Sequence, residues 1–276
     1  MIVDLHTHTT ASDGSLSPLE LVQRAQERGV ELLAITDHDS IDAFSQLEGL
    51  GEPALRLITG AEFSCNWQGV NIHVLGLGMD AQHPGLASAM RSQQEARDSR
   101  AEEIDRRLAK KGITGTLAVI RNKVKDSRPV GRPDFARQMV DAGVVSSMND
   151  AFDRYLGAGK IGDVKAMWPS LDKIIPWIHE AGGAAVIAHP LHYKMTNAKL
   201  RRLLAEFSEL KGDGLEVCNG RPPETELVYL RELCRFFDLE ASAGSDFHHL
   251  SQWSDLGCDS AVLGNCRPVW QRWMAQ

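Results

Sequence analysis

Short apolar runs alternate along the chain with longer stretches in which apolar residues recur every three or four positions. Short runs between turn residues are typical of buried strands, and the wider spacing is typical of amphipathic helices. Most of the runs are separated by such helical stretches, which favours β/α units with parallel strands. Seven runs predict strands, at 2–5, 32–36, 56–63, 70–75, 184–188, 214–218 and 239–243.

The first predicted helix has a complete start signal. Ser17 is a favourable N-cap, Pro18 suits the first helical position, and Glu20 completes a capping box. Gly29 then predicts the end of this helix, because glycine readily adopts the conformation that follows a last helical turn. Further helices are predicted at 171–181, 198–210 and 224–237.

The stretch 84–168 departs from this alternation. Residues 92–110 form a polar, strongly charged helical segment with few apolar positions, and shorter helical segments follow it. We therefore expect a distorted seven-stranded (β/α)7 barrel of the TIM type, formed by residues 1–83 and 169–276. Residues 84–168 would be a helical insertion that acts as a substrate lid.

Composition limits the classes of function. The 276 residues are 43% hydrophobic and 24% charged, as in an ordinary globular protein. No apolar run approaches the roughly 20 residues that cross a bilayer, and a removable leader is not expected with His6 so near the start. The five cysteines form no C-x-x-C pair, which favours free thiols and a cytoplasmic location. A net charge of −7 argues against bulk attraction to long nucleic acid.

Nine side chains of the kinds that bind divalent cations lie at or near the ends of the predicted strands. Neutral imidazoles and carboxylates are typical ligands of Zn²⁺, Mn²⁺ and Fe²⁺. Residues two apart in an extended segment point to the same side, so His6 and His8 can bind one ion together. Because the carboxyl ends of parallel strands meet at one edge, we expect the whole set to converge. The set is His6, His8, Asp13, His38, Glu62, His73, His189, Asp246 and His248.

Five short motifs around these residues resemble those of the PHP family (polymerase and histidinol phosphatase). They are Asp4-Leu5-His6-Thr7-His8 with Ser12-Asp13-Gly14, Thr36-Asp37-His38-Asp39, Gly60-Ala61-Glu62, Ala188-His189-Pro190, and Gly244-Ser245-Asp246-Phe247-His248. The insertion is similar to that of the small TrpH-like branch, and within it to the 3′,5′-nucleoside bisphosphate phosphatases. The resemblance implies a (β/α)7 barrel and two to three divalent ions, with Mn²⁺ expected and Zn²⁺, Fe²⁺ or Mg²⁺ as alternatives.

The resemblance also implies how the ligands are shared. The first ion would take His6, His8, Glu62 and Asp246, the second Glu62, His73 and His189, and the third Asp13, His38 and His248. Aspartate at position 13, where some members have histidine, favours Mn²⁺ or Mg²⁺ over Zn²⁺. A hydroxide between the first two ions would attack phosphorus in line. The implied catalytic residues are His6, His8, Glu62, His189 and Asp246.

A basic segment in the insertion is a candidate phosphate clamp. Five cations lie between residues 121 and 132, and Arg132-Pro133 reads as a helix start whose free N–H groups favour an anion. A solvated basic face is the alternative. The expected substrate contacts are Arg128, Arg132 and Ser127, followed by Lys123.

Four further residues are candidates for supporting roles. Asp37 and Asp39 flank His38, and at least one of them is expected to orient its imidazole. Trp168 and Phe247 are candidates for stacking on a base, although a tryptophan in this position is as often part of the core.

The leading hypothesis is removal of the 3′-phosphate from nucleoside 3′,5′-bisphosphates. The runner-up is a 5′→3′ exonuclease on short RNA or DNA, because one such site can accept monoesters and diesters. A histidinol phosphatase is less favoured, since its cationic substrate calls for an acidic lining. A non-catalytic metal-binding accessory domain is disfavoured because all nine ligand positions are filled.

Overall fold

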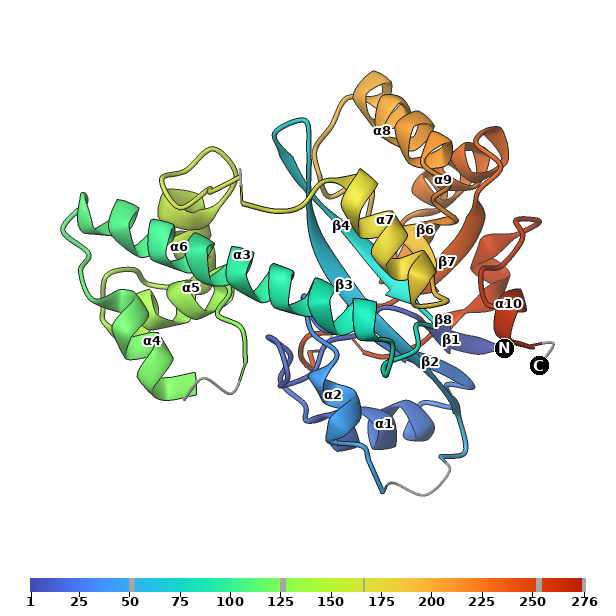
Figure 1. The fold of residues 1–276 in the computed structure, drawn as a ribbon, viewed down its shortest axis with the longest axis horizontal. Helices are drawn as coiled ribbons and strands as arrows, with labels where there is room; N and C mark the ends of the chain where they lie inside the picture. The colour runs from blue at the N-terminus through green and yellow to red at the C-terminus, as the bar shows by residue number, and fades with distance from the viewer. Residues whose placement is uncertain (50–52, 125–127, 166, 252–254, 275–276) are drawn as a thin grey trace.

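The computed structural model describes residues 1–49, 53–124, 128–165, 167–251 and 255–274, which form a strongly curved sheet surrounded by helices (Figure 1). Hydrogen bonds from Leu5 N to Ala243 O and from Asp246 N to His6 O join the end of the seventh strand and the residues after it to the segment that follows the first strand, so the sheet is a nearly closed barrel. The strand order is β7-β6-β5-β4-β3-β2-β1-β8. The strands are β1 (Ile2–Asp4), β2 (Leu32–Ile35), β3 (Arg56–Trp67), β4 (Val70–Leu77), β5 (Ala184–Ile187), β6 (Gly214–Asn219), β7 (Glu240–Gly244) and β8 (Cys258–Asp259).

All seven predicted strands are present, and the barrel prediction is confirmed with one addition. The eighth strand, β8, pairs antiparallel with β1 through two residues only. A run of two residues carries no periodicity, so the sequence pattern had no means of indicating it.

Among the seven longer strands, one runs against the others. β1, β2 and β3 are mutually parallel, as are β5, β6 and β7, whereas β4 is antiparallel to both β3 and β5. The expectation of parallel strand ends throughout is therefore wrong for Glu62 and His73, which lie inside β3 and β4. Only Gln68 and Gly69, both with positive φ, separate these strands, and so short a connection imposes an antiparallel hairpin.

Helices cover the outside of the sheet and bury its apolar outer face. The helix start at Ser17 is confirmed, because its side chain and that of Glu20 form a reciprocal capping box. The main core joins side chains of the strands and these helices, among them Phe63, Val186 and Leu203. The helices of the barrel are α1 (Pro18–Glu27), α2 (Asp42–Ser45), α7 (Leu171–Glu180), α8 (Asn197–Glu209), α9 (Glu224–Phe236) and α10 (Gln271–Met274).

The middle of the chain is helical and extends away from the sheet (Figure 1). Its elements are α3 (Pro84–Ala109), α4 (Thr116–Val124), α5 (Arg132–Asp141), α6 (Met148–Ala151) and a π-helical turn at Phe152–Leu156. Leu86 and Ala89 at the start of α3 pack in the barrel core, whereas Ile104 further along packs with Phe135 in a second core. The long helix therefore links the barrel to the helical region. None of the described helices is both long and apolar enough to cross a membrane.

Candidate metal centre

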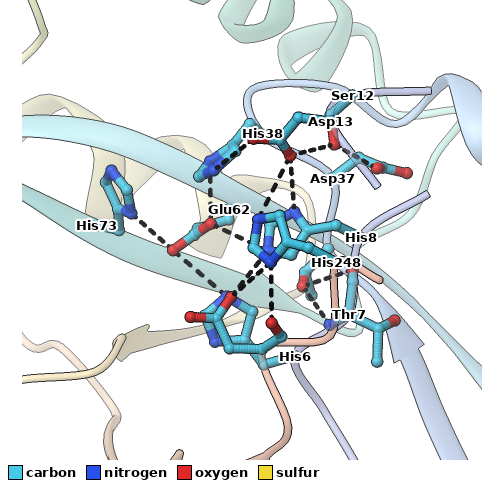
Figure 2. A network of polar contacts seen from close by, with 12 residues as sticks. His6, Thr7, His8, Ser12, Asp13, Asp37, His38, Glu62, His73 and His248 are labelled. Atoms are coloured by element: carbon cyan, nitrogen blue, oxygen red, sulfur yellow. Dashed lines mark hydrogen bonds and ion pairs between the residues drawn. The ribbon is translucent and has the colours of Figure 1, made fainter. Parts of the chain in front are cut away.

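The nine predicted ligand side chains converge on one site. Figure 2 shows His6, His8, Asp13, His38, Glu62, His73 and His248 pointing toward one another. His6 and His8 follow β1, His38 follows β2, and His189 follows β5. The ligand atoms form four groups in which all atoms lie within 4.8 Å of one another. The groups are His8–Asp13–His38–His248, His6–Glu62–His189, His6–His8–Asp246 and His38–Glu62–His73.

Glu62 occupies the middle of the cluster. One of its oxygens, Oε1, lies 2.7 Å from His73 Nδ1 and 2.9 Å from His189 Nε2. The other, Oε2, lies 2.9 Å from His38 Nδ1. Burial by itself would raise the pKa of this carboxyl, but the surrounding imidazoles hold the pKa of Glu62 well below its ordinary value. The central group is therefore an ionised carboxylate shared by several rings.

Several buried polar atoms of the cluster have no hydrogen-bond partner among the described residues. They include His6 Nε2, His8 Nε2 and His189 Nδ1. Leaving such atoms unpaired in a protein interior is costly, and native structures rarely do so. Divalent cations would satisfy them, because imidazole nitrogens and carboxylate oxygens are their usual donors. The residues present thus fit a centre of divalent metal ions.

The groups overlap with the expected sets of ligands but divide them differently, because His6 also lies with Glu62 and His189, and His38 also lies with Glu62 and His73. His73 Nδ1 and His189 Nε2 lie 3.2 Å apart and both face Glu62 Oε1. His8 belongs to the group of Asp13 as well as to that of Asp246. The placement of each ion, and the choice of Mn²⁺, stay predictions.

Asp37 and Asp39 do not act on His38 as expected. Asp37 accepts hydrogen bonds from Thr9 N and Thr9 Oγ1, both at 2.7 Å, and from Ser12 Oγ, so it holds the loop that carries Asp13 (Figure 2). Asp39 accepts from Ser64 and pairs with Arg97. Both carboxylates shape the backbone around the cluster, which sequence adjacency to His38 did not reveal.

A pocket of about 200 Å³ opens beside the cluster. Four of the nine ligands line it, together with three arginines that come from the helical region. Its lining includes Asp13, His38, His73, His248, Asn71, Arg97, Arg100, Arg132, Phe152 and Trp168. Cationic side chains and the ligand cluster therefore share one hollow.

Of the four predicted substrate contacts, Arg132 lines this pocket. Lys123 instead binds Gln138 and Asp141, at 2.7 and 2.8 Å, on an exposed surface. Arg128 forms an ion pair with Asp134, and the shorter of their contacts is 2.6 Å. Asp134 also accepts a hydrogen bond from Gly131 N at the start of α5. Ser127 lies outside the described residues.

Arg97 and Arg100 are pocket residues that the sequence analysis missed. Gln93, Arg97, Arg100 and Ile104 follow helical spacing and are all buried, so a polar stripe of α3 faces inward. That spacing could have indicated a buried face, but the many other charged residues of the segment favoured a helix exposed to solvent on all sides. The guanidinium carbons of both arginines lie over Trp168, at 5.3 and 5.2 Å from the ring centroid.

The aromatic predictions have different outcomes. Trp168 lines the pocket, although two arginines already cover its ring. Phe247 is fully buried in the core next to α1, so the prediction that it stacks on a base is wrong. Its position in the motif between two ligands brought it close to the site, but its ring turns inward.

The PHP domain model matches residues 4–157, which is more than half of the chain. The chain belongs to the PHP domain family. This PHP domain protein is 42% identical over 270 residues to a 5′-3′ exoribonuclease of Haemophilus influenzae, covering 98% of each chain. It is 35% identical to a 3′,5′-nucleoside bisphosphate phosphatase of Chromobacterium violaceum, covering 98% of this chain and 95% of the relative.

A solved structure has the same fold. An amidohydrolase from Chromobacterium violaceum, with bound sulfate and no metal, matches with a TM-score of 0.87 and 34% identity over 98% of this chain and 95% of that one. The family resemblance and the prediction of a phosphoric ester hydrolase are thereby confirmed.

Proposed function

We propose that this PHP domain protein hydrolyses the 3′-phosphate ester of nucleotides that also carry a 5′-phosphate, with nucleoside 3′,5′-bisphosphates as substrates. The observation that carries this proposal is the shared pocket, lined by ligand-cluster residues on one side and by Arg97, Arg100 and Arg132 on the other. A substrate with two phosphates can place one against each group.

The nine clustered side chains would hold two or three divalent ions. Mn²⁺ is the proposed metal because Asp13 adds a hard oxygen ligand to the three imidazoles of its group. When bound, such ions lower the pKa of water and neutralise charge on phosphate oxygens. Glu62 stays ionised at the centre of the cluster. The side chains of His6, His8, His189 and Asp246 lie around it and would complete the binding of the ions. These five residues are the proposed catalytic set.

Arg100 and Arg132 would bind the 5′-phosphate. Burial, together with the positive charges of Arg132 and Arg97, holds the pKa of Arg100 well below its ordinary value. A second phosphate would compensate this concentration of positive charge and accept charge-assisted hydrogen bonds. Lys123, Ser127 and Arg128 remain proposed substrate contacts, and residues 84–168 remain the proposed substrate lid.

A second candidate is a 5′→3′ exoribonuclease that acts on short 5′-phosphorylated RNA. It is favoured by the relative of that name at 42% identity. Both reactions break the bond between phosphorus and the 3′-oxygen of a 5′-phosphorylated nucleotide, so one site can serve both. The five buried free thiols are consistent with a cytoplasmic location for either role.

The experiment compares substrates with and without the 5′-phosphate. We expect kcat/KM to be at least about tenfold higher for a nucleoside 3′,5′-bisphosphate than for the 3′-monophosphate of the same nucleoside, since one charge-assisted contact contributes about 1.5–3 kcal/mol. Equal values would reject the proposal. Turnover of a 5′-phosphorylated trinucleotide without turnover of the bisphosphate would replace it by the exoribonuclease.

A further inference from the structure

Glu216 is a fully buried carboxylate in β6, between apolar neighbours that belong to the core. It lies behind the ligand cluster and is absent from the four groups of ligand atoms. Its Oε1 lies 2.9 Å from His6 Nδ1, while its Oε2 accepts hydrogen bonds from His189 N at 2.6 Å and Asn219 Nδ2 at 3.1 Å. A buried charge with contacts to two ligand residues requires an explanation beyond packing.

The contact with His6 determines which ring nitrogen carries the proton. A carboxylate oxygen can only accept, so His6 Nδ1 must donate to Glu216. The neutral ring then presents the lone pair of Nε2 to the cluster, where this atom lies 3.4 Å from both Glu62 Oε1 and Asp246 Oδ1. A metal ligand needs that lone pair, and a carboxylate behind the ring strengthens it as a donor.

The contact with His189 acts on the backbone. His189 has a φ of +26°, which non-glycine residues rarely adopt. Its N–H donates to Glu216 Oε2, and its Nε2 reaches Glu62 Oε1 at 2.9 Å. Such a conformation persists only where its surroundings hold it. One carboxylate thus fixes a side-chain tautomer and a strained peptide at once.

We infer that Glu216 is a positioning residue for the His6–Glu62–His189 group. It does not position the His8–Asp13–His38–His248 group, because neither His6 nor His189 belongs to that group. This inference rests on the proposed metal centre. It assigns Glu216 a role in metal affinity at part of the centre, without contact to a substrate.

Glu216→Gln isolates this role because an amide has a single acceptor oxygen. If that oxygen keeps the bond to His189 N, the amide N–H groups face His6 Nδ1 and force its proton onto Nε2. If it keeps His6, the amide N–H groups oppose the N–H of His189. Either arrangement disturbs a ligand of the same group.

The test records the tautomer of His6 in ¹⁵N-histidine-labelled protein loaded with Zn²⁺, because an imidazole that binds a metal carries only one ring proton. Affinities are measured by titrating Mn²⁺ or Zn²⁺ into metal-free protein against a chromophoric chelator. In the wild type we expect the His6 proton on Nδ1. In Glu216→Gln we expect about a 10–100-fold loss of affinity for some of the ions, as is typical for partners of metal-binding histidines, with the remaining ions bound as before.

The matched control is Glu240→Gln. Glu240 is a buried carboxylate on the neighbouring β7, where it pairs with Arg272 at 2.7 Å and with Arg267. This variant should lower thermal stability and leave both the His6 tautomer and the metal affinities unchanged. An equal loss of affinity in Glu240→Gln would overturn the inference.

Two further outcomes also decide against it. A wild-type His6 protonated on Nε2 overturns it even if Glu216→Gln does not fold, and so does a folded Glu216→Gln with wild-type affinity for every ion. These readouts do not depend on which phosphate ester is cleaved. Failure of the proposed substrate therefore leaves them intact, whereas a wild type that binds no metal rejects the proposed centre itself.

Discussion

Replacing Arg100 by methionine should change catalysis and stability in opposite directions. The side chain is only 6% exposed, and the described part of the chain offers its guanidinium one long hydrogen bond, of 3.4 Å, to Val164 O. No carboxylate among the described residues forms an ion pair with it, while burial and two nearby arginines lower its pKa. A buried cation without an ion-pair partner lowers the stability of the free protein, and binding of an anion would compensate its charge.

The structure sets the size of both effects. Loss of one charge-assisted hydrogen bond to the 5′-phosphate costs about 1.5–3 kcal/mol, which lowers kcat/KM on a 3′,5′-bisphosphate by about 10–150-fold. The 3′-monophosphate has nothing to bind there and should be affected little. Methionine removes the uncompensated charge but also the contact with Trp168, so the free energy of unfolding should rise by about 1–2 kcal/mol.

The assay combines steady-state kinetics on both substrates with thermal unfolding of the metal-free protein, where this gain corresponds to an increase in Tm of a few degrees. Arg106→Met is the control, because Arg106 is 58% exposed and pairs only with Glu103 among the described residues, so neither quantity should change. An equal loss of kcat/KM on both substrates, or a lower Tm with unchanged selectivity, would refute the reasoning.

Three other perturbations follow from the same structure. Exhaustive chelation should abolish phosphate release and re-addition of a divalent ion should restore it; full activity after chelation would exclude the metal centre. Gly244→Ala should lower Tm and weaken metal binding, because a Cβ there would lie 2.4 Å from His6 Cβ, and unchanged calorimetry would contradict this. The Cys234 thiol and the nearby Arg235 and Arg231 hold the pKa of the Cys266 thiol below its ordinary value although burial opposes this, so alkylation by iodoacetamide, followed by mass spectrometry, should begin at a lower pH than for an ordinary thiol. Cys65, whose pKa burial raises, is the unreactive control, and a Cys266 midpoint at the ordinary thiol value of about 8.5 would count against this reasoning.

Much of the barrel and of the cluster could be predicted from local pattern. The seven longer strands follow from short apolar runs, and the start of α1 follows from Ser17 and Glu20. The nine ligand-type residues were identifiable because most of them adjoin or interrupt such a run, and because the ends and the hairpin of neighbouring strands meet at one end of the sheet.

The pocket was less accessible to such reasoning. Arg128 and Lys123 belong to a basic segment, but Asp134, Gln138 and Asp141 on α5 bind them. Charge counted along the sequence cannot include partners that only packing supplies. Arg100 is the opposite case. It belongs to a strongly charged helix that the sequence predicts to be solvated, yet the packing of that helix buries its side chain.

The sequence by itself thus determined the seven longer strands, the family and the candidate ligand residues, because these depend on apolar periodicity and on residue types at fixed spacing. Only the tertiary structure decided the direction of β4, which arginines face the pocket, and the placement of Glu216 behind His6 and His189. The physical reason is that direction, burial and hydrogen bonding between distant segments depend on the path of the whole chain, which a local pattern does not contain.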